Sequence, residues 1–331
     1  MNQKNKSVLG VTLFSFTNEW QQRKYDLEGM IAEVAKKNLG PAIEIVGFQS
    51  FREFPDVTDE VAKDFRNIMD RYEMIPSCLG ANLDIGIYKN RVMTSDEMVE
   101  YAARQITSAK KLGFPVLRIQ TFAKPDTLGK LIPIAEKAGV HLASELHSPL
   151  TIDNPDVIEL LEYYQKIQST VLGFIPDFSS SMNTVPELFW KNLQNVGASE
   201  ELINRATNIW HMKVDPKTKF EKLHEACKEL NAPPAVAGQI NMSLTMFGNM
   251  PVEGWQEIIP YAKHIHGKFY EVNDEGIEPS IPYTEIMHLL KTEGFNGTIS
   301  AEWEGQAFTE EPIGFQQVEA WHNMCKKLLA D

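Results

Sequence analysis

The sequence predicts an α/β protein with a (β/α)8 TIM-barrel fold, in a single domain that covers residues 1–331. From Ser7 onward, short β-rich runs alternate with helical stretches, which is the order of a parallel sheet with crossover helices. Eight such runs can be found, enough for the sheet to close into a barrel. A chain of 331 residues, 43% of them hydrophobic, can also bury one large core.

Most of the eight expected strands are nearly continuous apolar runs, as is typical of strands that are buried on both faces. Several of these runs end in polar residues, which in a barrel reach the C-terminal mouth. In chain order the expected strands are Val8–Ser15, Ala42–Gly47, Ile75–Ala81, Val116–Thr121, Val140–His147, Leu172–Phe178, His264–Tyr270 and Thr298–Glu304.

The stretches between the strands repeat apolar residues at the spacing of one helix face. The helix expected before Gly113 begins with Ser95 as its N-cap, followed by two acidic residues in its first turn. The last two helices are expected to include Ile286–Leu290 and Phe315–Leu329.

The interval between the sixth and seventh strands is longer than a single helix requires, so we interpret residues 186–260 as an insertion in the barrel. It contains the methionine-rich segment Gln239–Met250, and such segments adapt to irregular apolar surfaces. This segment could cover a substrate or a partner subunit. The alternative is that its residues only fill a small core within the insertion.

Charge and hydropathy exclude some classes of function. The net charge of −13 disfavours a nucleic-acid substrate, because that affinity depends on basic residues that neutralise phosphates. No segment approaches the run of about 18 apolar residues that suggests a membrane span, and the start of the chain lacks the apolar run of a signal peptide. We therefore expect a cytoplasmic protein with three reduced cysteines, Cys78, Cys227 and Cys325.

Ionisable residues gather at the ends of four late strands, where barrel enzymes place their functional groups. Because side chains alternate along a strand, these residues can be sorted by face. The groups that share a face are Glu145 with His147, His264 with His266 and Lys268, and Glu302 with Glu304, and Asp177 ends the sixth strand alone.

These residues together predict a divalent metal ion. A lone carboxylate at a strand end is usually salt-bridged or solvated, and a lone histidine is usually a satisfied core residue. Several such groups in one buried barrel mouth would be desolvated at considerable cost unless a cation compensated them. Three oxygen donors with one nitrogen favour Mn²⁺, before Mg²⁺, Co²⁺ or Zn²⁺.

The order and spacing of these residues resemble the xylose isomerase-like sugar isomerase/epimerase barrels. The resemblance is carried by Glu145 with His147, and by the runs Pro176-Asp177-Phe178, His264-Ile-His266-Gly-Lys268-Phe269 and Gly297-Thr-Ile-Ser-Ala-Glu302. It implies that the metal ligands are Glu145, Asp177, His266 and Glu302. On alternation alone, His264 and Glu304 compete with His266 and Glu302, and only the family pattern decides between them.

A narrower resemblance is to the α (catalytic) subunits of bacterial C-glycoside deglycosidases. It rests on the opening run from Phe14 to Trp20, on Glu145-Leu-His147, and on the run from His264 to Glu271 followed by Ile281-Pro282-Tyr283. This resemblance implies a carbon–carbon lyase that removes the proton next to the ketone of a 3-oxo-C-glycoside and releases the aromatic aglycone. It also implies a small β-rich β subunit as partner.

His147 is the candidate general base, because an imidazole needs little adjustment of its pKa to accept a proton near neutral pH. The alternative is that His147 only supports a neighbouring ligand through a hydrogen bond. We expect His264 and Lys268 to bind substrate oxygens, and Glu304 to support the site.

The aromatic residues Phe14, Phe16, Trp20 and Phe247 are candidates for a surface that binds the aglycone, with barrel packing as the alternative for each. Three other classes of function share parts of this pattern. A metal-dependent sugar isomerase or epimerase would use the same enolate without a leaving group. A barrel that acts on abasic DNA is disfavoured by the acidic charge, and a metal-free binding protein would hold no stoichiometric ion.

Overall fold

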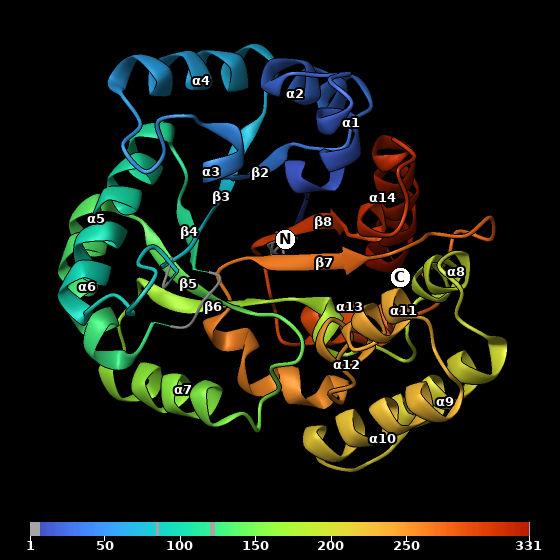
Figure 1. Cartoon of the computed structure of the whole chain (residues 1–331). Helices are drawn as coiled ribbons and strands as arrows, with labels where there is room; N and C mark the ends of the chain where they lie inside the picture. The colour runs from blue at the N-terminus through green and yellow to red at the C-terminus, as the bar shows by residue number, and fades with distance from the viewer. Residues whose placement is uncertain (1–6, 84–85, 120–122, 331) are drawn as a thin grey trace.

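Eight parallel strands form the centre of the protein in a computed structural model that describes residues 7–83, 86–119 and 123–330 (Figure 1). All eight expected strands are present, which confirms the predicted TIM barrel. They are β1 (Val8–Thr12), β2 (Ala42–Val46), β3 (Ile75–Ala81), β4 (Val116–Ile119), β5 (His141–Leu146), β6 (Leu172–Pro176), β7 (Ile265–Phe269) and β8 (Thr298–Trp303).

The strands are hydrogen-bonded in the order β6-β5-β4-β3-β2-β1-β8-β7. The two ends of this sheet meet through isolated parallel bridges, which pair Phe174 with Ala262 and Asp177 with His266. The barrel is therefore nearly closed. The second bridge lies just beyond β6 and brings two of the predicted metal ligands side by side.

Helices surround the barrel and cover the outer faces of the strands (Figure 1). Their buried faces follow the predicted spacing, since Ala102, Ala109 and Leu112 of one helix are all buried. The helices that ring the barrel are α1 (Thr17–Gln21), α2 (Leu27–Lys36), α3 (Gly47–Ser50), α4 (Asp59–Arg71), α5 (Ser95–Leu112), α6 (Pro125–Ala138), α7 (Pro155–Ile167), α13 (Tyr283–Thr292) and α14 (Gly314–Ala330).

Several predicted boundaries were wrong by a few residues. The first strand ends at Thr12 rather than Ser15, because the chain turns into the 3-10 helix η1 (Leu13–Phe16) and the Thr12 side chain accepts a hydrogen bond from the Phe14 backbone N–H. Thr94, not Ser95, is the N-cap of α5, where it forms a capping box with Glu97. The predicted end of the fourth strand, at Thr121, lies outside the described residues.

The segment between β6 and β7 forms a helical layer on one side of the barrel (Figure 1). Phe247 is buried in it and packs edge-on against Phe189 and Tyr270. These contacts build a small core between the segment and the barrel. Its elements are η2 (Phe178–Ser180), α8 (Glu187–Asn195), α9 (Glu200–His211), α10 (Pro216–Glu229), α11 (Pro234–Gln239), α12 (Met242–Thr245), η3 (Val252–Glu257) and η4 (Ile259–Tyr261).

Cys78, Cys227 and Cys325 are buried and free, as the sequence predicts. Among the described residues, no helix combines the length and apolar character needed to cross a membrane.

Candidate metal centre and active-site cavity

Glu145, Asp177, His266 and Glu302 converge at the C-terminal mouth of the barrel. Glu145 lies on β5, His266 on β7 and Glu302 on β8, while Asp177 follows β6 directly. All four are buried, and one potential ligand atom from each lies within 4.8 Å of those of the others. The four residues that the family pattern selects are thus the ones that the fold brings together.

The two nitrogens of His266 face different surroundings. Nδ1 lies 2.7 Å from Glu145 Oε1 and 3.0 Å from Glu302 Oε2, so it points into the carboxylate cluster. On the other side of the ring, Nε2 donates a hydrogen bond of 2.9 Å to Glu44 Oε1. The imidazole is therefore oriented with Nδ1 toward the carboxylates, where it could act as a ligand to an ion that they hold.

The electrostatics of this cluster fit a divalent cation. Burial acts to lower the pKa of His266, but Glu302, Glu44 and Glu145 together raise it well above its ordinary value. Asp177 Oδ2 is buried with no hydrogen bond of good geometry, although Lys268 Nζ lies 3.4 Å from it. A metal ion would take the place of the proton on Nδ1 and neutralise the buried carboxylates. Three carboxylates and one imidazole could hold such an ion.

Glu44 is a buried residue of the site that we did not predict from the sequence. It lies on β2, with Oε1 at 2.9 Å from His266 Nε2 and Oε2 at 2.9 Å from His264 Nε2. His264 is also 2.9 Å from the Ser300 hydroxyl. His264 is therefore a buried partner of Glu44 in this structure, and its contact with substrate oxygens stays a prediction.

Arg118, on β4, is the second residue that the sequence analysis missed. It is buried, and Nη1 lies 2.8 Å from Glu145 Oε2. Although burial acts to raise the pKa of Glu145, Arg118 and His266 lower it below its ordinary value. Arg118 thus holds one oxygen of Glu145, while the other oxygen of that carboxylate faces the cluster.

Lys268 and Glu304 form a pair at the edge of the cluster. Lys268 Nζ lies 3.3 Å from Glu302 Oε1 and 3.4 Å from Asp177 Oδ2, and it donates a hydrogen bond to Glu304 Oε2. Burial acts to lower the pKa of Lys268, but the carboxylates of Asp177 and Glu302 raise it well above its ordinary value. Lys268 is therefore a charged donor next to the candidate metal centre, and Glu304 pairs with Lys268.

His147 lies two residues beyond Glu145, just after β5. Its Nδ1 donates a hydrogen bond of 2.6 Å to the Ser148 carbonyl oxygen. This bond fixes the tautomer in which Nε2 carries the lone pair. Burial acts to lower the pKa of His147, but Asp177 raises it. A cation bound among the carboxylates would counter that effect of Asp177.

A cavity of about 190 Å³ opens onto these groups. It is lined by His147, Lys268 and Glu304 together with two members of the ligand cluster, Glu145 and Glu302. Glu44 and Arg118 also line it. A small substrate in this cavity would contact the candidate base, the candidate metal centre and a charged amine at once.

The four aromatic candidates lie in different places. Phe16 is fully buried and stacks on Phe315 at a ring-centroid distance of 3.9 Å. The Phe16 ring has no exposed surface in this structure, which favours the alternative of barrel packing, and its contact with substrate stays a prediction. Phe247 is likewise a core residue. Phe14 lines the cavity, and Trp20 is 44% exposed near it, in a second cavity that also includes Phe14.

A parallel barrel with ionisable residues gathered at its C-terminal mouth is the arrangement of an enzyme active site. The family described as xylose isomerase-like TIM barrel matches residues 33–322, and the chain belongs to this family. Within it, the chain is similar to the alpha subunits of C-glycoside deglycosidases. Both resemblances predicted from the sequence are confirmed, and the chain is an enzyme.

Two curated relatives align with this chain over most of their length. A 3'-dehydrocarminate deglycosidase alpha subunit from a Microbacterium species is 33% identical over 332 residues, covering 98% of this chain and 95% of that protein. A C-glycoside deglycosidase alpha subunit from Microbacterium trichothecenolyticum is 36% identical over 307 residues, covering 90% of this chain and 83% of that protein.

Solved structures agree on the fold. D-Psicose 3-epimerase with D-tagatose, from Clostridium cellulolyticum H10, has a TM-score of 0.58 at 12% identity and covers 97% of this chain and 99% of that one. The IOLI protein with a binding zinc atom has a TM-score of 0.55 at 14% identity, with 98% of each chain covered. At these identities the likeness extends to the fold alone.

Replacing Glu44 with Gln is expected to weaken metal binding by roughly 10- to 100-fold, the usual scale for a carboxylate that orients a histidine ligand. Glutamine keeps the volume of the side chain but removes the charge that faces His266 Nε2. The dissociation constant for Mn²⁺, measured by competition with a chromophoric chelator, checks this. Glu187→Gln, at an exposed position on α8, is the control. An unchanged constant in Glu44→Gln would mean that Glu44 does not position the ligand.

Proposed function

We propose that this chain is the catalytic subunit of a C-glycoside deglycosidase. Its reaction is the removal of the proton at C2 of a 3-oxo-C-glycoside, next to the ketone, followed by release of the aromatic aglycone from C1. The observation that carries the proposal is the shared cavity, which is lined by His147, by Lys268 and by two of the carboxylates of the cluster, Glu145 and Glu302. The similarity to two deglycosidase alpha subunits over most of the chain supports it.

The reaction divides between a base and groups that hold negative charge. His147 accepts the C2 proton at Nε2, and the electron pair moves onto the carbonyl oxygen as an enolate. Lys268, kept charged by the carboxylates around it, donates a hydrogen bond to a substrate oxygen in this cavity. Glu304 and Glu302 hold the Lys268 ammonium in place.

The second half of the reaction breaks the carbon–carbon bond. The enolate electron pair forms the C1–C2 double bond, and the bond from C1 to the aromatic ring is broken. The ring carbon takes up one proton for the one removed from C2, so that the products are the aglycone and an unsaturated anhydro-ketose. Without a leaving group at C1, the same enolate would be reprotonated, which gives an epimerase or isomerase.

The proposed metal is Mn²⁺, with Mg²⁺, Co²⁺ and Zn²⁺ as alternatives, and its proposed ligands are Glu145, Asp177, His266 and Glu302. When bound, a divalent ion supplies a Lewis acid that polarises the ketone oxygen and stabilises the enolate charge. Glu44 and Arg118 orient two of these ligands, through His266 and Glu145 respectively. The hard oxygen-rich donor set favours Mn²⁺.

We also propose that the chain works with a small β-rich β subunit, because its relatives are named alpha subunits. The proposed location of this complex is the cytoplasm. Purification from the native host under mild conditions tests this partner directly. A second polypeptide that co-elutes in fixed stoichiometry supports it, and a lone, fully active chain contradicts it.

The reaction itself is tested on protein purified from its native host, so that any partner is retained, and loaded with Mn²⁺. One sample receives an aryl 3-oxo-C-glycoside, and a second receives an aglycone-free 3-oxo sugar in D2O. We expect chromatography to detect free aglycone from the first, and NMR to detect exchange of the C2 proton in the second. Exchange without any release would favour an epimerase or isomerase, and the absence of both with all four metals would contradict the proposal.

A further inference from the structure

We propose that a second cavity, next to the one that contains the candidate base, binds the aromatic aglycone of the substrate. This inference rests on the proposed function, and it adds the place and the chemistry of aglycone recognition. The cavity has a volume of about 260 Å³ and is bounded by η1, α1, the start of α2 and α3. These segments follow β1 and β2, on the same mouth of the barrel as the metal ligands.

The two cavities are adjacent. Phe14, Val46 and Gln49 line both of them. Val46 is the last residue of β2, two positions beyond Glu44, which contacts His266. A substrate whose sugar lies against the candidate metal centre would therefore place a group attached to that sugar beside Phe14 and Gln49, at the boundary with the second cavity.

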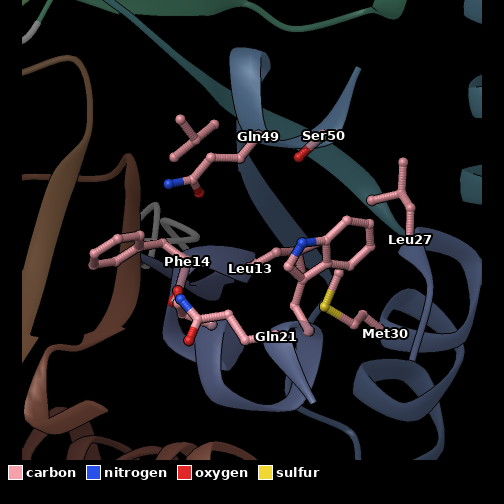
Figure 2. Close-up of a pocket in the computed structure, with 10 residues that line it drawn as sticks. Leu13, Phe14, Gln21, Leu27, Met30, Gln49 and Ser50 are labelled. Carbon is pink, nitrogen blue, oxygen red and sulfur yellow. The ribbon is translucent and has the colours of Figure 1, made fainter. Parts of the chain in front are cut away.

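The walls of the second cavity suit a flat aromatic group. Figure 2 shows Phe14 on one side and Leu27 with Met30 on the opposite side, with Gln49 above and Gln21 below. The Trp20 side chain, 44% exposed, also lines this space. Aromatic and aliphatic walls of this kind bind planar rings by apolar contact and ring stacking.

The few polar groups in the wall match the hydroxyl groups of a phenolic ring. Among the described residues, no hydrogen bond holds the side chains of Gln21, Gln49 or Ser50. Each amide offers both a donor and an acceptor, and the hydroxyl of Ser50 offers the same. A second sugar ring would require more polar partners than these walls supply. The occupant that fits is thus an aromatic ring system with a few hydroxyl groups.

The test compares two substrates of the complete enzyme, an aryl 3-oxo-C-glycoside and the aglycone-free 3-oxo sugar. Replacing Trp20 with Ala is expected to raise KM for the glycoside roughly tenfold relative to KM for the sugar, the scale of one lost aromatic contact. Trp20→Phe should restore most of this loss. Ser50→Trp should have the same effect as Trp20→Ala by filling the cavity. Ile158→Ala, at a similarly exposed site on α7, is the control.

A second measurement does not depend on the proposed reaction. It is the direct binding of a trihydroxyflavone, measured by equilibrium dialysis. We expect Trp20→Ala and Ser50→Trp to weaken its binding roughly tenfold, whether or not the protein turns over any substrate. If the wild type releases aglycone but neither variant changes the KM ratio or flavone binding, the second cavity is not the aglycone site. Loss of a co-purified β subunit in Trp20→Ala, with both values unchanged, would also overturn the proposal and assign the cavity to a subunit contact.

Discussion

Replacing Asp177 with Ala is expected to abolish metal binding and turnover together. Asp177 is fully buried and belongs to the four-residue cluster, and its Oδ2 has no hydrogen bond of good geometry. If the ion stabilises the enolate by about 4 kcal/mol, its loss lowers turnover roughly 1,000-fold. Metal content after dialysis and aglycone release, measured on the same samples, check both effects.

Asp177→Asn separates the role of the charge from that of the fold. Asp177 Oδ1 accepts a hydrogen bond of 2.7 Å from the Ser179 backbone N–H and so caps η2. Asparagine can keep this bond, but it removes the negative charge. We expect Asp177→Asn to fold like the wild type and still to bind no metal. Asp274→Ala, at an exposed position after β7, serves as the control. A metal-free variant with full activity would exclude the proposed site.

The strands could be predicted because each is an apolar run long enough to cross the barrel, and burial on both faces leaves few other places for such a run. Their ends depend on local bonds that the pattern does not contain. If the alternation of the expected strand Val8–Ser15 continued by one residue, Phe14 and Phe16 would lie on one face. The turn at Thr12 breaks that alternation, so that Phe14 lines the cavity while Phe16 stacks on Phe315 in the core.

The sequence predicted only those site residues that lie at the ends of strands. Glu44 and Arg118 lie within β2 and β4, so a search of strand ends passed over them. A signal was present, because each is the one charged residue in a fully buried strand, with the sequences Ala-Ile-Glu-Ile-Val and Val-Leu-Arg-Ile. A buried charge in such a strand requires a partner. The identity of that partner, His266 or Glu145, depends on strands far apart in the chain and follows only from the closed barrel.

His266 and His264 share a face, but they lie at different depths in the barrel, and this decides which of them is the candidate metal ligand. His264 directly precedes β7 and His266 lies within it. His266 is nearer the mouth and meets the ligand carboxylates, while His264 meets Glu44 and Ser300. Alternation along a strand assigns a face but not a depth. The registers of the neighbouring strands set that depth, because Asp177 is bridged to His266 itself.

Replacing His147 with Ala is expected to leave the metal bound and to lower turnover at least ~100-fold, the usual scale for the loss of a general base. His147 is outside the four-residue cluster, so its removal takes away no proposed ligand. The hydrogen bond from Nδ1 to Ser148 leaves Nε2 as the acceptor, and the ring lines the same cavity as Glu145 and Lys268.

Two measurements on His147→Ala distinguish a base from a residue that only supports the metal ligands. A base is required for C2 proton exchange of the aglycone-free 3-oxo sugar in D2O, so exchange and aglycone release should fall by the same factor, with metal content unchanged. If His147 instead supports a ligand, metal affinity should fall, and excess Mn²⁺ should restore turnover. His224→Ala, an exposed histidine on α10, controls for the loss of an imidazole elsewhere. Turnover near that of the wild type would assign proton abstraction to another group in the cavity, such as Lys268, which lies 3.3 Å from Glu302, or its partner Glu304.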